Sequence, residues 1–477
     1  MTTTVIRGGT VLTAAGAHEI DLVVRDGLVD SWCTPGTVTD ADEVVDATGM
    51  HVAPGFVDVH THLEAVVAGV STADDFESGT RAAAFGGTTT VVDFVRQGPG
   101  EDLLERLADA SERASGRCAI DYGFHQIVGD VRESSLAQFT ELLAAGVPSI
   151  KLFMAFPGDL YSDDAQLLTA MERAAELGIT VMIHAENGLA MEFLRQRARE
   201  RGQLSLAWHA KTAPPAVEGE ATRRAIVLAE LAGMPTLYFV HVSSADALDA
   251  IADARRRGLP VYAETCPHYL YLDTAELDRP WAQGADFVCA PPLRTREHRD
   301  RLWWALSAND LSVVSSDHCP FCRSTLFPPD ERDFSQLPGG IAGIEFRVPL
   351  IYDAALRGKL SLPRFVDVTA TSPARAFGLH PEKGSLAPGS HADITVLDPQ
   401  GVTRTQAADH HMRVDHSVFE SLTLRGRVHA VYLRGRQLIQ DGRWVGPQQD
   451  GRFIPRRPGT DLYDRRSLPG RDGTAVS

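Results

Sequence analysis

The sequence predicts an α/β fold in which a (β/α)8 TIM barrel carries a small β-sandwich domain formed by both chain termini. Short β-rich runs alternate with helical stretches from about residue 53 to 380, and strand patterns with turn signals occupy both ends of the chain. The length of 477 residues suits one large barrel with a smaller companion domain.

The first 50 residues have the pattern of short strands. Apolar runs of strand type occur in TVIRGGTVLT and EIDLVVRDGLVDSW. Asp26-Gly27 lies between two such runs and is a hairpin signal. We therefore assign residues 1–52 to the β-sandwich domain.

Residues 53–382 are assigned to the barrel because strand-like and helical runs alternate through them. The pairs are TTTVVDFV before a helix over about 101–115, SIKLFMAF before TAMERAAELG, TVMIHAEN before LAMEFLRQRARE, and LYFVHVSS before ADALDAIADARRRG. This alternation indicates βα units around a parallel sheet, and an eight-stranded barrel is the leading arrangement. Barrel enzymes place their chemistry at the C-terminal ends of the strands.

The C-terminal part repeats the strand pattern of the first 50 residues. HADITVLDP and RVHAVYLRGRQLIQDGRW contain alternating strands with a second Asp-Gly pair at 441–442, so residues 383–446 join 1–52 in the β-sandwich. From 447 the chain is rich in Pro, Gly, Arg and Asp without an apolar period. We expect an extended C-terminal tail over 447–477, which either serves subunit contact or has no role.

Charge and composition exclude several classes of partner. With 46 basic and 63 acidic residues the net charge is −17, which repels nucleic acid and anionic membranes. No run reaches the length of an apolar membrane span, and the start MTTTVIRGGTVLT lacks the pattern of a signal peptide. Six scattered cysteines fit reduced thiols, so we expect a cytoplasmic protein. The Cys319-Pro-Phe-Cys322 pair is interpreted as a loop beside Asp317 rather than a redox pair or half a zinc site.

The run FVDVHTH ends in two histidines, His60 and His62. Residues i and i+2 share a face in a strand, so both imidazoles can reach one cation of the borderline type, such as zinc. Taken alone, this pair is equally consistent with two ordinary polar histidines.

Three further ligand-type residues follow apolar strand-like runs: His184 in TVMIHAEN, His241 in LYFVHVSS and Asp317 in LSVVSSDHCP. Any one of them is more often a satisfied buried polar residue than a ligand. Together with the histidine pair they occupy four strand ends of one predicted barrel, so all would converge on the same mouth.

Lys151 lies inside the apolar run SIKLFMAF, where a charged ammonium is costly. One interpretation is a lysine that reaches outward from a strand end, or one neutralised by burial. The other is a neutral amine that adds carbon dioxide and becomes a carbamate, whose two oxygens can bridge two cations. The residues alone leave both open.

A series of ordered motifs resembles the hydantoinase and dihydropyrimidinase branch of the cyclic amidohydrolases, within the amidohydrolase superfamily. The motifs run through nearly the whole chain: PGFVDVHTH, GGTTTVVDF, IKLFMAF, VMIHAENG, EGEATRRA, HVSS, ETCPHYL, APPLR, SSDHCPF, GGIAGIEFR and HHMRVDHSVFE. The resemblance implies a barrel flanked by a β-sandwich and a homo-oligomer, either a tetramer or a dimer.

The resemblance also implies two divalent metal ions in each chain. His60, His62 and Asp317 would hold the more buried ion, His184 and His241 the more exposed one, and N6-carboxylated Lys151 would bridge them. Nitrogen and oxygen ligands suit zinc, manganese, iron or cobalt, and zinc is the default. The implied reaction opens a hydantoin or dihydropyrimidine ring to an N-carbamoyl amino acid. A hydroxide held by the metals attacks, and Asp317 shuttles the proton.

Three substrate-contact positions depart from the pattern of the resembled branch. Phe156 replaces a tyrosine whose hydroxyl assists the oxyanion, Ala290 replaces a serine, and Gly339 replaces an asparagine. The last two bind the cyclic ureide largely through main-chain groups, so the changed side chains matter less. The small-molecule substrate is therefore a cyclic ureide or amide whose ring the sequence does not identify.

Two alternatives remain open. The segment GGIAG looks closer to allantoinases, which also lack the tyrosine, so allantoin is the rival ring. The collapsin response mediator proteins resemble the same branch but are noncatalytic oligomeric scaffolds that have lost metal ligands. All six ligand positions are filled here, which favours an enzyme.

Overall fold

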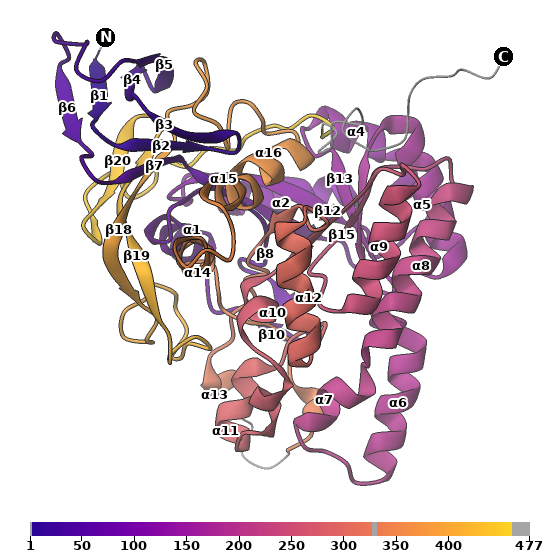
Figure 1. The fold of residues 1–477 in the computed structure, drawn as a ribbon. Helices are drawn as coiled ribbons and strands as arrows, with labels where there is room; N and C mark the ends of the chain where they lie inside the picture. The colour runs from indigo at the N-terminus through magenta and orange to yellow at the C-terminus, as the bar shows by residue number, and fades with distance from the viewer. Residues whose placement is uncertain (1, 327–331, 460–477) are drawn as a thin grey trace.

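The computed structural model describes residues 2–326 and 332–459, and its central sheet is a parallel barrel (Figure 1). Its eight strands pair in chain order: β8 (Phe56–Thr61), β11 (Thr88–Arg96), β12 (Asp121–Ile127), β13 (Ser149–Phe153), β14 (Thr180–His184), β15 (Leu237–Phe239), β16 (Val261–Thr265) and β17 (Val313–Val314). The ring closes where Thr61 forms a parallel bridge with His318, four residues after β17. The predicted (β/α)8 class is confirmed.

The longer helices pack around this barrel (Figure 1). They are α1 (Phe76–Phe85), α2 (Leu103–Ala114), α5 (Asp164–Leu177), α6 (Gly188–Glu200), α8 (Pro215–Leu231), α9 (Ala245–Arg256), α12 (Arg296–Ser307) and α14 (Arg347–Leu356). The helix predicted over 101–115 is α2. Its Asp102 carboxylate caps it by accepting from the Leu104 and Glu105 N–H groups at 2.9 and 3.0 Å. It buries Leu103, Leu107, Ala110 and Ala114, a helical spacing that turns one face to the barrel.

Short elements fill the connections. They are β9 (Val66–Val67), β10 (Val70–Ser71), α3 (Glu133–Ala137), α4 (Phe139–Ala144), α7 (Ala207–Thr212), α10 (Pro267–Tyr271), η1 (Thr274–Asp278), α11 (Trp281–Gly284), η2 (Ala285–Phe287), α13 (Arg323–Leu326), η3 (Phe334–Gln336), α15 (Leu362–Val366), η4 (Asp367–Thr371) and α16 (Ser372–Ala376). Among the described residues, no helix is both long and apolar enough to cross a bilayer.

Strands from both ends of the chain form two further sheets. One has the order β5-β4-β1-β6 and the other the order β21-β20-β19-β18-β7-β2-β3. Their strands are β1 (Thr3–Arg7), β2 (Thr10–Thr13), β3 (Gly16–Glu19), β4 (Asp21–Arg25), β5 (Leu28–Cys33), β6 (Glu43–Asp46), β7 (His51–Pro54), β18 (Ile394–Arg404), β19 (Thr423–Leu433), β20 (Arg436–Gln440) and β21 (Arg443–Trp444). Residues of both sheets share one core, including Leu22, Val29, Val52 and Ile394, so the two sheets form a sandwich.

The two predicted Asp-Gly hairpins are confirmed. Asp26 and Gly27 have φ of 49° and 80°, and Asp441 and Gly442 have φ of 48° and 71°. Two consecutive residues in the left-handed region match the right-handed twist of the flanking strands. The pairs connect β4 to β5 and β20 to β21.

The described part of the predicted tail, residues 447–459, contains no helix or multi-residue strand and lies against the barrel. Gly451 N–H donates to Cys118 O at 3.0 Å, and Ile454 N–H donates to Tyr122 O at 2.8 Å. These contacts lie at the N-terminal end of β12, on the floor opposite the predicted mouth. Residues 460–477 of the predicted tail lie outside the described residues.

Candidate metal centre and its cavity

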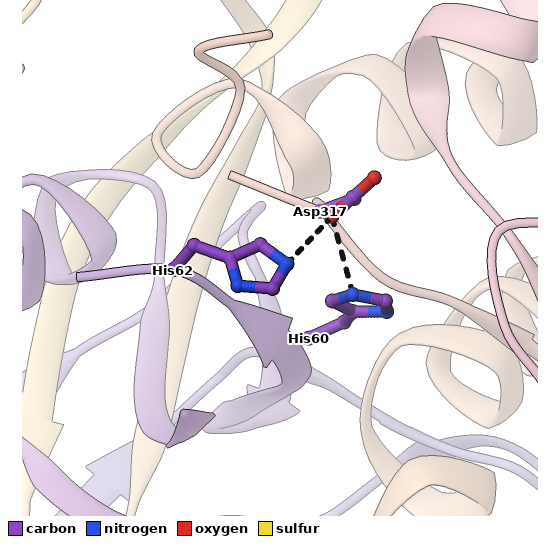
Figure 2. Close-up of side chains that lie close together, drawn as sticks. All are labelled: His60, His62 and Asp317. Carbon is purple, nitrogen blue, oxygen red and sulfur yellow. Dashed lines mark ion pairs between the residues drawn. The ribbon is translucent and has the colours of Figure 1, made fainter. Parts of the chain in front are cut away.

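The predicted ligands lie at the C-terminal ends of five barrel strands. His60 is in β8 and Lys151 in β13, and His184 is the last residue of β14. His241 follows β15 by two residues, and Asp317 follows β17 by three. Figure 2 shows His60 and His62 turned toward Asp317, and the Nε2 atoms of both histidines lie 3.2 Å from Asp317 Oδ1. The strand-end pattern therefore brings these side chains to one point.

Lys151 contacts the same group. Its Nζ lies 3.1 Å from His60 Nε2 and over the rings of Phe94 and Phe153, at 4.3 and 4.9 Å from their centroids. Burial lowers the pKa of Lys151 from 10.5 to about 8. A substantial fraction of neutral amine near pH 7 to 8 follows from that value, in contrast to an exposed lysine.

His184 and His241 form the second half of the group. Their ring centroids are 4.5 Å apart, and the His241 ring is 5.5 Å from that of His60. His184 Nε2 lies 2.8 Å from Glu186 Oε2, which leaves Nδ1 as its second ring nitrogen. His241 Nδ1 is buried without a hydrogen-bond partner among the described residues. A buried unpaired imidazole nitrogen is costly unless it has a ligand.

Glu264 contacts His60 through the ring nitrogen that does not face Asp317. Its Oε1 lies 2.5 Å from His60 Nδ1, and its Oε2 accepts the Tyr238 hydroxyl at 2.8 Å. Burial raises the pKa of Glu264 to about 8, and a cation held by His60 would favour the ionised carboxylate. A carboxylate that binds one nitrogen of a histidine and orients the other toward a metal is common at metal sites.

Burial keeps the imidazoles of His60 and His62 neutral. Burial lowers the pKa of His60 to about 3 and that of His62 to about 4, and Lys151 adds to both effects. Burial alone would raise the pKa of Asp317, but His60, His62 and His241 hold it well below its usual value. Neutral imidazoles around an ionised carboxylate are the protonation states that metal binding requires.

The donor atoms fit a divalent cation. One ligand atom from each of His60, His62 and Asp317 lies within 4.8 Å of the others, and the set is partly buried. A second group joins Asp317 to Cys266 and His268. Burial raises the pKa of the Cys266 thiol well above its usual value, which disfavours the thiolate. The histidine–aspartate group is therefore the better metal site, as nitrogen and oxygen donors suit zinc and its neighbours.

A cavity of about 970 Å³ opens over this centre. Its wall contains the three residues that the sequence predicts to contact substrate, Phe156, Ala290 and Gly339. Phe156 has a φ of 62°, and its ring centroid is 5.1 Å from that of His184. A Cβ on Gly339 would lie 3.4 Å from Ala290 N, so the backbones of these two positions are close neighbours.

Several residues that hold the predicted ligands in place were not among those predicted from the sequence. Besides Glu264 and Glu186, Asp58 Oδ1 accepts the Ser316 N–H at 3.0 Å and so joins β8 to the segment that carries Asp317. The buried Arg347 Nε lies 3.4 Å from Asp58 Oδ2. Asp58 and Glu264 lie in buried strands, as several of the predicted ligands do, and this was the signal that the sequence offered. Cys319 and Cys322 are both free thiols.

The barrel, the flanking sandwich and this donor set define a metal-dependent hydrolase of the amidohydrolase class. The chain belongs to the amidohydrolase family, which matches residues 51–438. Within that family it belongs to the hydantoinase and dihydropyrimidinase branch.

Individual relatives cover almost the whole chain. A D-hydantoinase of Streptomyces coelicolor is 46% identical over 95% of this chain and 98% of its own length. A D-hydantoinase of Ralstonia pickettii is 40% identical over the same shares of the two chains. The crystal structure of dihydropyrimidinase from Brevibacillus agri superposes with a TM-score of 0.93 at 42% identity, over 96% of this chain and 100% of that one.

Proposed function

We propose that this chain hydrolyses a ring amide of a hydantoin- or dihydropyrimidine-type cyclic ureide to give an N-carbamoyl amino acid. The observation that carries the proposal is the convergence of His60, His62, Lys151, His184, His241 and Asp317 at one barrel mouth, in a chain 46% identical to a D-hydantoinase. Water adds across the C–N bond: the carbonyl carbon gains a hydroxyl and the ring nitrogen gains a hydrogen. The chain is a cyclic amidohydrolase rather than a noncatalytic scaffold.

Two divalent cations, which we propose to be zinc, are the cofactors. His60, His62 and Asp317 would hold one, and His184 and His241 the other. When bound, such a pair lowers the pKa of water and polarises the ring carbonyl. Glu264 and Glu186 orient the imidazoles through their second nitrogens.

Lys151 is proposed to be N6-carboxylated and to bridge the two cations. The neutral amine adds carbon dioxide, a C–N bond forms, and one proton leaves to give a carbamate anion. The support is its burial, its pKa of about 8 and its position 3.1 Å from His60 Nε2. Carboxylation replaces a buried cation, which repels metals, with two oxygen donors.

Asp317 is the proposed proton carrier. Its Oδ1 faces both His60 and His62, while the side chain retains 13% exposure toward the cavity. It accepts a proton from the attacking water and returns it to the ring nitrogen as the C–N bond breaks. An ionised carboxylate with a pKa held low suits the first step.

Phe156, Ala290 and Gly339 are proposed to contact the ring, with Ala290 and Gly339 acting through their backbones. Phe156 has no hydroxyl to donate to the oxyanion. That absence favours allantoin as the second candidate substrate, because allantoinases also lack the tyrosine.

The deciding experiment assays purified enzyme, with metal content measured, against both enantiomers of 5-substituted hydantoins, dihydrouracil and allantoin. We expect turnover of hydantoins or dihydrouracil, with the D enantiomer preferred as the names of the relatives suggest. Turnover of allantoin alone would establish the second candidate. Metal-loaded protein that opens none of the rings would refute the proposal.

We further propose a cytoplasmic homo-oligomer, either a dimer or a tetramer. The six free cysteines fit a reducing compartment. Apolar side chains exposed on two long helices, Leu189 and Phe193 on α6 and Val227 and Leu231 on α8, fit a subunit contact. Light scattering coupled to size-exclusion chromatography measures the number of subunits.

A further inference from the structure

Arg195 lies on the inward face of α6. Met191 and Ala198, at positions i−4 and i+3, are only 1% and 2% exposed, whereas Phe193 on the outer face is 57% exposed. The half-buried Arg195 side chain lines the same cavity as His184, His241 and Phe156. A cation is therefore held at the wall of the candidate active site.

Arg195 differs from the other arginines of this cavity wall, each of which has a carboxylate partner. Arg96 pairs with Asp159, Arg106 with Glu101 at 4.0 Å, and Arg113 with Glu64 at 3.0 Å. Within residues 2–326 and 332–459, Arg195 makes no ion pair or hydrogen bond, although Glu192 lines the cavity one turn earlier. A guanidinium with five donors that is half withdrawn from water and unpaired has the properties of an anion-binding group.

Because of the direction of α6, the Arg195 side chain extends toward the candidate metal centre. The helix begins at Gly188, four residues after His184, and side chains on a helix lean toward its N-terminus. The Arg195 backbone lies about 10 Å along the helix from Gly188, since each residue rises about 1.5 Å. An anion bound there would sit at the end of a substituent, several bonds from the ring.

The positive charge of Arg195 acts on another residue of the cavity wall. Burial lowers the pKa of the cavity residue His209 to about 4, and Arg195 contributes to that shift.

We propose that Arg195 is a specificity-determining residue that binds a carboxylate at the far end of the substrate's ring substituent. The substrate class is then a cyclic ureide with an acidic side chain, such as a 5-(carboxyalkyl)hydantoin. This inference rests on the proposed ring-opening function and adds the identity of the substituent. The apolar wall formed by Phe153 and Phe156 accommodates the methylene chain that links ring and carboxylate.

The test compares D-5-(2-carboxyethyl)- and D-5-(4-carboxybutyl)hydantoin with the neutral carboxamides of the same length. We expect the wild-type enzyme to favour the carboxylates by about tenfold in kcat/KM, as a charge-assisted hydrogen bond would give. In Arg195→Gln the ratio of carboxylate to carboxamide falls to about one. In Arg197→Gln, on the exposed face of the same helix, the ratio stays at the wild-type value. Arg195→Glu should favour 5-(aminoalkyl)hydantoins instead.

Different results would refute the proposed ring-opening function and the proposed role of Arg195. If metal-loaded enzyme opens none of these rings, the proposed function fails. If it opens the carboxamides and carboxylates equally well, or if Arg195→Gln keeps the carboxylate preference, only the role of Arg195 is overturned. Because the ratio compares substrates on one protein sample, partial unfolding or metal loss in a variant does not change it.

Discussion

At the residue scale, Lys151 is the most informative position of the centre. The residue is 1% exposed, and its Nζ lies 3.1 Å from His60 Nε2. We expect Lys151→Ala to lose most bound metal and at least a hundredfold in kcat, because the variant cannot form the proposed carbamate and its bridging oxygens. Metal analysis and ring-opening assays measure both losses. The exposed Lys359→Ala is the control and should retain metal and rate.

The proposed carbamate at Lys151 predicts a second result, which is rescue of Lys151→Ala by an added carboxylate. Short carboxylates such as propionate should restore part of the metal content and activity of Lys151→Ala, because a carboxylate supplies the two oxygens that the proposed carbamate would provide. No such rescue is expected if a plain amine is the native group. A variant that keeps full metal and turnover would contradict the carbamate altogether.

Phe156 tests how the oxyanion is stabilised. Its ring lies 5.1 Å from that of His184 and lines the cavity. We expect Phe156→Tyr to raise kcat for hydantoin or dihydrouracil, by up to about a hundredfold if the hydroxyl reaches the oxyanion. The substrate panel provides the measurement, and Phe156→Leu controls for changes of shape. Identical kinetics in wild type and Phe156→Tyr would show that the position only packs.

The clustering of the predicted ligands could be anticipated from sequence, because each lies in an apolar strand or just after one. His184 ends β14, and His241 and Asp317 come just after theirs, so the barrel rule was sufficient to group them. Glu264 also lies in a buried strand, but which histidine it contacts depends on how β16 and β8 face each other across the barrel. Arg195 was not distinguishable from other helix arginines, because its unpaired state depends on the side chains around it.

At the element scale, a buried charge cluster joins the barrel to the sandwich. Lys383 Nζ lies 2.5 Å from Asp121 Oδ2, in β12, and 2.7 Å from Asp393 Oδ2, beside β18. The substitution Lys383→Met leaves the buried carboxylates of Asp121 and Asp393 without this cation. We expect a loss of about 3–5 kcal/mol of stability near neutral pH, measured as a lower apparent Tm or denaturant midpoint. Lys359→Met is the exposed control.

The stability lost in Lys383→Met should become smaller as the pH falls. Burial would raise the pKa of Asp121, but Lys383 and Arg434 lower it below 3.8. The ionised Asp121 therefore contributes stability that is present above pH 3.8 and disappears as the pH falls through its lowered pKa. The stability difference between wild type and Lys383→Met should narrow as the pH falls toward 3. A difference independent of pH would argue against this charge pair as the cause.

The packing of segment 447–459 on the barrel could not be predicted from apolar periodicity. It has no apolar repeat, yet its Arg456 is 3% exposed and donates to Phe377 O at 3.4 Å and to Ser149 Oγ at 3.2 Å on the barrel floor. Such a segment is held by irregular backbone and side-chain contacts, which no sequence period encodes.

Arg456→Ala should accordingly destabilise the barrel. The truncation leaves a cavity and removes the donors to Phe377 O, Phe124 O and Ser149 Oγ, a loss of about 2–5 kcal/mol. The neighbouring Arg457 is exposed, so Arg457→Ala is the matched control. Thermal unfolding of both variants at equal metal loading measures the effect, and equal Tm values would show that Arg456 is dispensable.

At the scale of the whole molecule, the centre depends on closure of the barrel. Thr61 and His318 form the bridge between the first and last strands, and His62 N–H donates to His318 O at 2.9 Å. His60 and Asp317 therefore come from opposite ends of the barrel sequence and meet at its seam. A cation held by both would bind the folded chain and not the unfolded one, so metal binding and barrel stability are linked.

Metal removal should abolish activity and lower thermal stability but leave the fold in place. The buried cores of the barrel and sandwich do not require the cation, so chelation should leave the far-ultraviolet circular dichroism intact. It should abolish ring opening and lower the apparent Tm, since a ligand at a thousand times its Kd contributes about 4 kcal/mol. Adding Zn²⁺ back should restore both, whereas Lys151→Ala should regain little of either. If chelation removed activity without moving the Tm, the cation would not bridge the seam between β8 and the segment after β17.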